Sequence, residues 1–291
     1  MPRSTRSIAS TGDLPDRRAL GLLLARACEQ ADAEAARRWL LEGADPKTRS
    51  ARAGATPLHL ACGAADVERA GARRKLSFTH GPSSTGGPFE RAAIAAMLLD
   101  AGADLLAEDG QGRIALHVAC AAGSGPLARL LIERGSPVEA HSRASHGSTP
   151  LCQACAPKDS YAPGGPVDAL LELGASPHAP GSDRIPPLHR AVANPGALAA
   201  LLRAGADPDS RDGAGRTALL RAYDTNRAAS ARLLTLAGAD PTLADERGRA
   251  PGCDDGRGGA AAWLILAEIE RLSIERALGP AGADPARAPR L

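Results

Sequence analysis

The sequence predicts an all-α solenoid of stacked helix-turn-helix units with short hairpin loops, and three observations support this fold class. A Gly-Ala-Asp-like signal recurs with steps of 59, 33, 39, 31 and 33 residues, at Gly43, Gly102, Gly135, Gly174, Gly205 and Gly238. A tetrad such as Thr56-Pro57-Leu58-His59 precedes most of these glycines. Aromatic residues make up only 2% of a chain that is 44% apolar, so alanine and leucine must fill thin helical layers.

The tetrads explain how each unit begins, and the glycines explain how it ends. Threonine suits a helix N-cap, proline suits the first helical position, and glycine adopts the left-handed conformation that ends a helix. The tetrad leucines are expected to point into the stack: Leu58, Leu116, Leu151, Leu188 and Leu219. The second helices each add an apolar pair: Trp39-Leu40, Leu98-Leu99, Leu131-Ile132, Leu170-Leu171 and Leu201-Leu202. One helix pair cannot bury its own apolar face, so neighbouring units must stack.

This pattern resembles the ankyrin repeat, with its period of 33 and its Thr-Pro-Leu-His-x-Ala signature, over about residues 20–278. We expect a disordered tail at 1–17 and an ankyrin repeat domain at 18–278, with about six repeats and a degenerate C-terminal cap. A flexible tail is expected at 279–291. The cap should include an amphipathic helix over 260–278, with apolar Trp263, Leu266, Ile269 and Leu272.

The cysteines offer one chemical alternative. Cys152 and Cys155 form a Cys-x-x-Cys pair, a spacing found in redox and zinc sites. Cys155 nevertheless shares with Cys28, Cys62 and Cys120 the small position that follows the signature alanine, which favours a core role. A metal- or redox-dependent regulator using Cys152 and Cys155 remains the alternative function.

No catalytic site, metal or cofactor is predicted. His59, His117 and His189 are separated by whole repeats, so they cannot converge on one metal ion. The resemblance implies instead that these histidines hydrogen-bond neighbouring turns. No Ser-His-Asp order, phosphate-binding glycine loop or paired-carboxylate motif is present.

Charge and composition limit the classes of partner and the type of source organism. The net charge is +2, with 35 basic and 33 acidic residues interspersed, which disfavours nucleic acid and anionic membranes. No apolar run approaches the ~20 residues of a membrane helix, so we expect a cytoplasmic protein. The excess of Ala, Gly, Arg and Pro is typical of a GC-rich genome and favours a bacterial source.

The resemblance implies that the protein binds another protein, as a monomer, through its hairpin tips and the exposed side of its first helices. Arginine is over-represented among the candidates, which suits an acidic partner surface. The hairpin candidates are Arg49, Arg52, Glu108, Gln111, Arg113, His146, Asp183, Arg184, Arg211 and Arg216. The candidates on first helices are Gln30, Arg190, Asn194, Arg221, Asp224 and Thr225.

An insertion at about 66–90 is the one feature that the repeat does not require. Ala61 lies 41 residues before Gly102, whereas Ala119 lies 16 residues before Gly135. Both phenylalanines of the chain, Phe78 and Phe89, fall here. They favour either a contact with the partner or docking onto the solenoid.

We expect deletion of residues 68–88, with a short Gly-Ser linker, to leave the fold intact. Each doubling of loop length costs only ~0.6 kcal/mol of closure entropy, and the other units close this loop without the insertion. The thermal unfolding midpoint of the variant should therefore match that of the parent within a few degrees. A clearly lower midpoint would mean that the phenylalanines dock on the solenoid.

Overall fold

The computed structural model describes residues 17–50, 54–63, 87–143, 148–156, 162–181, 183–251, 267 and 269–271. Within these ranges the chain is helical, apart from turns and one isolated bridge between Arg211 and Thr217. Residues 1–16 of the predicted N-terminal tail, the predicted C-terminal tail, Phe78 and most of the predicted helix 260–278 lie outside the described residues. Ile269, from that helix, is buried against the core.

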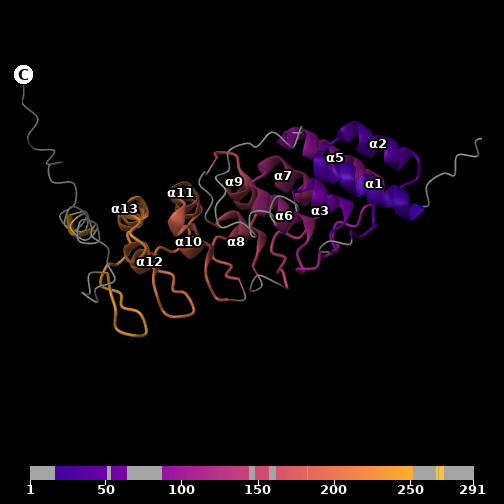
Figure 1. Ribbon diagram of the computed structural model, residues 1–291. Coiled ribbons are helices and arrows are strands. Elements are labelled where there is room, and N and C mark those ends of the chain that lie inside the picture. Colours follow the sequence, from indigo (N-terminus) through magenta and orange to yellow (C-terminus); the bar gives the residue numbers. More distant parts are fainter. Residues whose placement is uncertain are drawn as a thin grey trace, which may run out of the picture.

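Six helix pairs follow one another along the described chain and form an elongated stack (Figure 1). The pairs are α1 (Arg17–Gln30) with α2 (Ala33–Leu41), α3 (Pro57–Ala61) with α5 (Pro88–Asp100), α6 (Ala115–Ala122) with α7 (Gly125–Glu133), α8 (Pro150–Ala154) with α9 (Pro166–Glu172), α10 (Pro187–Arg190) and the 3-10 turn η2 (Ala191–Ala193) with α11 (Pro195–Arg203), and α12 (Ala218–Asp224) with α13 (Ala228–Leu236). The hairpins project in a row beside the first helices, and the second helices line the other side. The predicted all-α solenoid is confirmed.

The helix ends follow the sequence signals. Thr149 and Thr217 cap α8 and α12, because each hydroxyl accepts a hydrogen bond from the backbone N–H three residues later. Asp32 caps α2 in the same way through its carboxylate. The second helix α7 ends before Gly135, whose φ of 96° is a left-handed conformation that glycine adopts without strain.

The leucine pattern produces one continuous core. All five tetrad leucines are buried, and so are Leu98, Leu131, Leu170 and Leu201 of the second helices. The second residue of each apolar pair is only partly buried, because it lies at the edge of the layer. Trp39 is also only half-buried, and the guanidinium of Arg38 lies 4.9 Å from the centroid of its ring.

The insertion is shorter than the sequence predicts. Helix α5 already begins at residue 88, and the carboxylate of Glu90 accepts a hydrogen bond from the backbone N–H of Gly87 at its start. Residues 88–90 therefore belong to the helix, and the deletion proposed above should end at residue 86. Phe89 is 78% exposed, so its predicted docking onto the solenoid is wrong. Its place in the first turn of α5 points it away from the core.

Leu131→Ala should lower the free energy of unfolding by about 2–5 kcal/mol, because the substitution leaves a cavity in the middle of the stack. The matched control is Leu236→Ala on α13, where the leucine is 59% exposed and the loss should stay below about 1 kcal/mol. Urea unfolding followed by circular dichroism measures both. Equal losses would show that the assigned core is wrong.

Candidate protein-interaction surface

The hairpins between successive units form a row, which we call the hairpin row. The tetrad histidines His59, His117 and His189 bind this row to the first helices. Nε2 of His59 lies 2.9 Å from the carbonyl oxygen of Arg113, and Nε2 of His189 lies 2.9 Å from that of Ser210. Nε2 of His117 lies 3.0 Å from the carbonyl oxygens of both Ala140 and Ser148. Because a carbonyl oxygen only accepts, Nε2 carries the proton in each case. Each histidine therefore ties its first helix to the next hairpin, as the resemblance implied.

These histidines are held neutral by their surroundings. Burial lowers the pKa of His59 and His189, and it lowers the pKa of His117 to about 4. Hydrogen bonds to the carbonyl oxygens act in the opposite direction, but burial outweighs them. At neutral pH the histidines are thus uncharged structural donors rather than acid–base groups.

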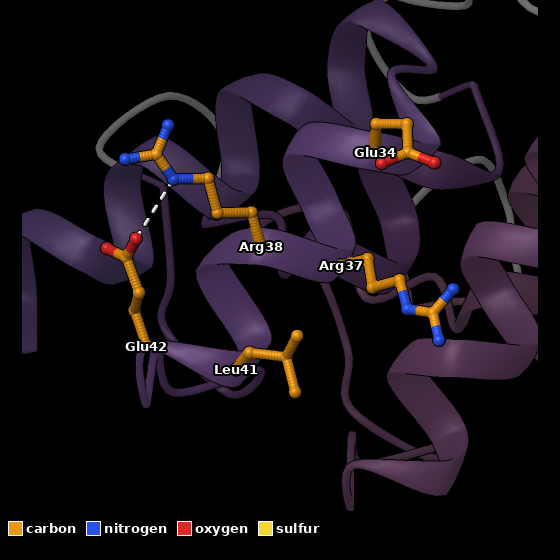
Figure 2. Close-up of a pocket in the computed structure, with 5 residues that line it drawn as sticks. All are labelled: Glu34, Arg37, Arg38, Leu41 and Glu42. Carbon is orange, nitrogen blue, oxygen red and sulfur yellow. Dashed lines mark hydrogen bonds and ion pairs between the residues drawn. The ribbon is translucent and has the colours of Figure 1, made fainter.

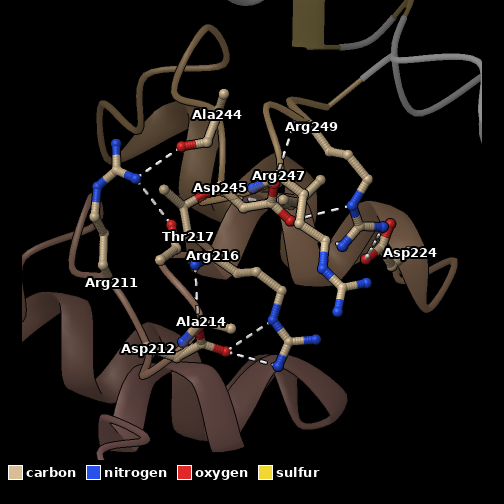
Figure 3. A network of polar contacts seen from close by, with 12 residues as sticks. Arg211, Asp212, Ala214, Arg216, Thr217, Asp224, Ala244, Asp245, Arg247 and Arg249 are labelled. Carbon is tan, nitrogen blue, oxygen red and sulfur yellow. Dashed lines mark hydrogen bonds and ion pairs between the residues drawn. The ribbon is translucent and has the colours of Figure 1, made fainter.

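Three hairpins share a turn that the sequence analysis missed, with the pattern Asp-x-x-Gly-Arg. It occurs at Asp109–Arg113, Asp212–Arg216 and Asp245–Arg249. In each turn one carboxylate oxygen accepts from the backbone N–H groups two and four residues later, and the other binds the arginine. Figure 3 shows the second and third turns side by side. The Asp-x-x-Gly-Arg pattern, which occurs three times in the sequence, was the signal that could have revealed them.

The arginine of each turn stabilises the charged aspartate. Burial alone would raise the pKa of Asp109, Asp212 and Asp245. Hydrogen bonds from the arginine side chain and from backbone N–H groups outweigh burial, so that the pKa of each carboxyl is lowered. Each turn is therefore stabilised by an ionised carboxylate that accepts hydrogen bonds from several donors.

Two exposed arginines join successive hairpins to each other. An Nη of Arg49 donates to the carbonyl oxygen of Glu108 at 2.8 Å, and an Nη of Arg211 donates to that of Ala244 at 2.7 Å (Figure 3). The same atoms also donate to Gly54 and Gly215 within their own hairpins. The hairpins consequently form a cross-linked row rather than independent loops.

The structure separates the predicted contact residues into accessible and buried ones. At least partly exposed are Gln30, Arg49, Glu108, Gln111, Asp183, Arg184, Arg190, Arg211, Arg216, Arg221, Asp224 and Thr225. Arg52 and His146 lie outside the described residues.

Two of the predicted contact residues are buried, and for these the prediction of an exposed contact is wrong. Arg113 is 4% exposed because its guanidinium is bound to the carboxylate of Asp109 at 2.7 Å. Asn194 is 7% exposed because its side chain caps α11 by accepting from the backbone N–H of Ala197. Both side chains stabilise the fold through these contacts and are not available to a partner.

The cysteines behave as core residues. Cys28, Cys62, Cys120, Cys152 and Cys155 are all buried and form no disulfide. Burial raises the pKa of Cys28 and Cys62 to about 12, and it also raises that of Cys152 and Cys155. A thiol that stays protonated is a poor nucleophile and a poor metal ligand. Among the described residues, no three His, Cys, Asp or Glu side chains are grouped to hold a metal ion.

A shallow depression lies on α2 (Figure 2), a second helix on the side of the stack away from the hairpins (Figure 1). It is lined by Glu34, Arg37, Arg38, Leu41 and Glu42. Arg38 is already paired with Glu42 at 2.9 Å, and Leu41 is 80% exposed. The depression is open to solvent and contains charges of both signs, so it has no evident chemistry of its own.

The family model for the ankyrin repeat matches residues 111–143, from one hairpin through α6 and α7 into the next. The mouse protein "Ankyrin repeat and SOCS box protein 16" is 44% identical over 108 residues, which cover 35% of this chain and 23% of that protein. Human "Neurogenic locus notch homolog protein 2" is 36% identical over 126 residues, which cover 43% of this chain and 5% of that protein. The match thus spans less than a quarter of either relative.

Solved structures show the same architecture over most of the chain. The ankyrin repeat domain of Bcl-3 aligns with a TM-score of 0.60 and 24% identity, covering 84% of this chain and 97% of that domain. The ankyrin repeat domain of human ASB11 aligns with a TM-score of 0.62 and 19% identity, covering 84% and 96%. At these identities the likeness shows the fold.

The class of protein follows from these findings together with the helix pairs and the histidine contacts. Residues 111–143 match the ankyrin repeat family, and the chain has the fold of an ankyrin repeat solenoid. Solenoids of this kind present an extended surface made from equivalent positions of successive repeats. None of the helices in the described part of the chain is long and apolar enough to cross a membrane.

His117 should make stability depend on pH between 7 and 5. The folded-state pKa of about 4 lies below the usual value of about 6.5, so the unfolded chain binds more protons in this range. The stabilisation is complete above the unfolded pKa and is lost as the pH falls toward the folded pKa. One such histidine should cost about 2 kcal/mol between pH 7 and pH 5.

His117→Gln tests this, because glutamine keeps a donor for the hairpin carbonyl oxygens but does not titrate. Urea unfolding at pH 7 and pH 5 should show a smaller loss for the variant than for the parent, by about that amount. His141→Gln, in an exposed hairpin position, is the control. An unchanged pH dependence in His117→Gln would contradict the assigned neutral state.

Proposed function

We propose that this chain is a protein-interaction module that holds a partner protein against its hairpin row and the exposed side of its first helices. The observation that carries the proposal is the cross-linked row itself. Hydrogen bonds from Arg49 and Arg211 fix one hairpin against the next, and those from the tetrad histidines tie the hairpins to the first helices. A surface that is ordered before binding loses little conformational entropy when a partner docks.

The proposed contact residues are those whose side chains are accessible: Arg49, Glu108, Gln111, Arg184, Arg190, Arg211, Arg216, Arg221 and Asp224. Arg52 and His146 remain predictions. Arg113 and Asn194 are omitted because both are buried in the scaffold.

The same proposal includes the setting of the module. We expect a bacterial protein that is a cytoplasmic monomer. We expect this protein to have no catalytic activity, to take no cofactor and to bind neither nucleic acid nor membranes. The near balance of 35 basic and 33 acidic residues supports a partner other than a nucleic acid or an anionic membrane.

Two double variants compare the faces of the stack. Arg184→Glu with Gln111→Arg alters exposed hairpin side chains, and Arg37→Glu with Arg203→Glu alters exposed side chains of second helices. The immobilised parent should capture specific proteins from an extract of the source organism, identified by mass spectrometry. The hairpin variant should lose them at least about tenfold, as expected when an interface charge is reversed, and the second-helix variant should keep them.

The opposite pattern, with capture lost only in the second-helix variant, would place the interaction surface on the other face. A parent that captures nothing beyond an unrelated control protein would contradict the proposed function. Circular dichroism spectra matching that of the parent are required of both variants.

A further inference from the structure

Three arginines gather on the first-helix side of the fifth and sixth units. Arg190 ends α10, Arg221 lies in the middle of α12, and Arg216 belongs to the hairpin that precedes α12. Their charges act on one another: burial has the largest effect and lowers the pKa of Arg221, Arg216 and Arg190 lower it further, and Asp212 and Asp183 raise it. Three guanidinium groups and two carboxylates are thus held within electrostatic reach of one another.

Two of the three guanidinium groups have a carboxylate partner and the third does not. Arg190 is paired with Asp183, and Arg216 is paired with Asp212 at 2.8 Å. In the part of the chain that the structure describes, no carboxylate lies within ion-pairing distance of Arg221. Nε of Arg190 is also buried without a hydrogen-bond partner. The three arginines and the two aspartates Asp183 and Asp212 therefore carry one net positive charge, and Nε of Arg190 remains an unused donor.

The following hairpin extends this charge. Arg247 is exposed, and Arg249 is paired with Asp245 at 2.9 Å and lies 3.8 Å from Asp224. Figure 3 shows the side chains of Arg216, Arg247 and Arg249 extending to the same side of the two hairpins. Arginines thus occur in successive units on one face, with aspartates between them.

We propose that Arg221, flanked by Arg190 and Arg216, binds a carboxylate of an extended acidic segment of the partner protein. This deepens the proposed function and rests on it. A guanidinium presents parallel N–H donors that match a carboxylate, and its attraction is strengthened where water is partly excluded. A second acidic side chain of an extended segment would reach Arg247 in the next unit.

The interleaved aspartates favour a protein over a nucleic acid. Asp183, Asp212, Asp224 and Asp245 would repel a continuous line of phosphates. A protein segment with acidic side chains separated by neutral ones places negative charge only where a guanidinium is available. The spacing of the charges, rather than the net charge, selects the ligand.

The test uses a fluorescein-labelled peptide of alternating glutamate and serine, and its glutamine–serine counterpart, with binding measured by fluorescence anisotropy at low salt. The acidic peptide should bind the full chain, and the neutral one should bind at least about tenfold more weakly. Arg221→Gln should weaken binding of the acidic peptide about tenfold. Arg221→Lys, which keeps the charge but loses the paired donors, should fall between.

Arg203→Gln is the matched control, because Arg203 is an exposed arginine on the second helix of the fifth unit. Its affinity for the acidic peptide should stay within about twofold of that of the parent. Equal losses in Arg203→Gln and Arg221→Gln would show an unspecific charge effect and overturn the inference. Failure of the parent to bind the acidic peptide, or unchanged binding by a folded Arg221→Gln, would also overturn it.

Two further outcomes separate the competing explanations. A short DNA duplex that binds more tightly than the peptide, and depends on Arg221, would replace the acidic segment with a nucleic acid. If Arg221→Gln still captures every protein that the hairpin double variant loses, the acidic-segment inference fails while the proposed function stands. If neither variant affects capture, both fail.

Discussion

The structure depends on the inability of one helix pair to bury its own apolar face. Leucines such as Leu116, Leu131 and Leu201 are fully buried only because the units on either side cover them. Burying one such side chain contributes about 1.5–3 kcal/mol, so each interface between units is a main source of stability. The chain therefore forms a linear stack, and its surface is a repeating series of equivalent positions.

The hairpins need a separate, polar means of attachment, and it varies along the stack. Where the tetrad carries histidine, Nε2 donates to the next hairpin, as at His59 and His189. In the fourth unit Cys152 takes this position, and its sulfur makes only long contacts of 3.9 and 4.0 Å to carbonyl oxygens. The hairpin after it is instead held by the pair between Arg190 and Asp183. A charged pair thus supports the hairpin where the neutral histidine is missing.

The same groups that hold the scaffold also shape the surface that we propose for binding. The charges of each Asp-x-x-Gly-Arg turn are paired within the turn, because each aspartate binds the arginine four residues later. Charge remains available only where an arginine lies outside such a turn or lacks a partner, as at Arg184 and Arg221. The binding that we propose for this face therefore depends on the arginines that are not paired within the scaffold.

The sequence by itself determined the fold, because period, helix caps, terminal glycines and buried leucines are local and regularly spaced signals. It also identified the cysteines as core residues from their shared register. Only the tertiary structure decided which polar side chains are accessible: Arg113 and Asn194 face inward, and Phe89 faces out. The reason is that a polar residue is buried only when a partner elsewhere in the fold satisfies its donors and acceptors, and the spacing of one repeat does not reveal that partner.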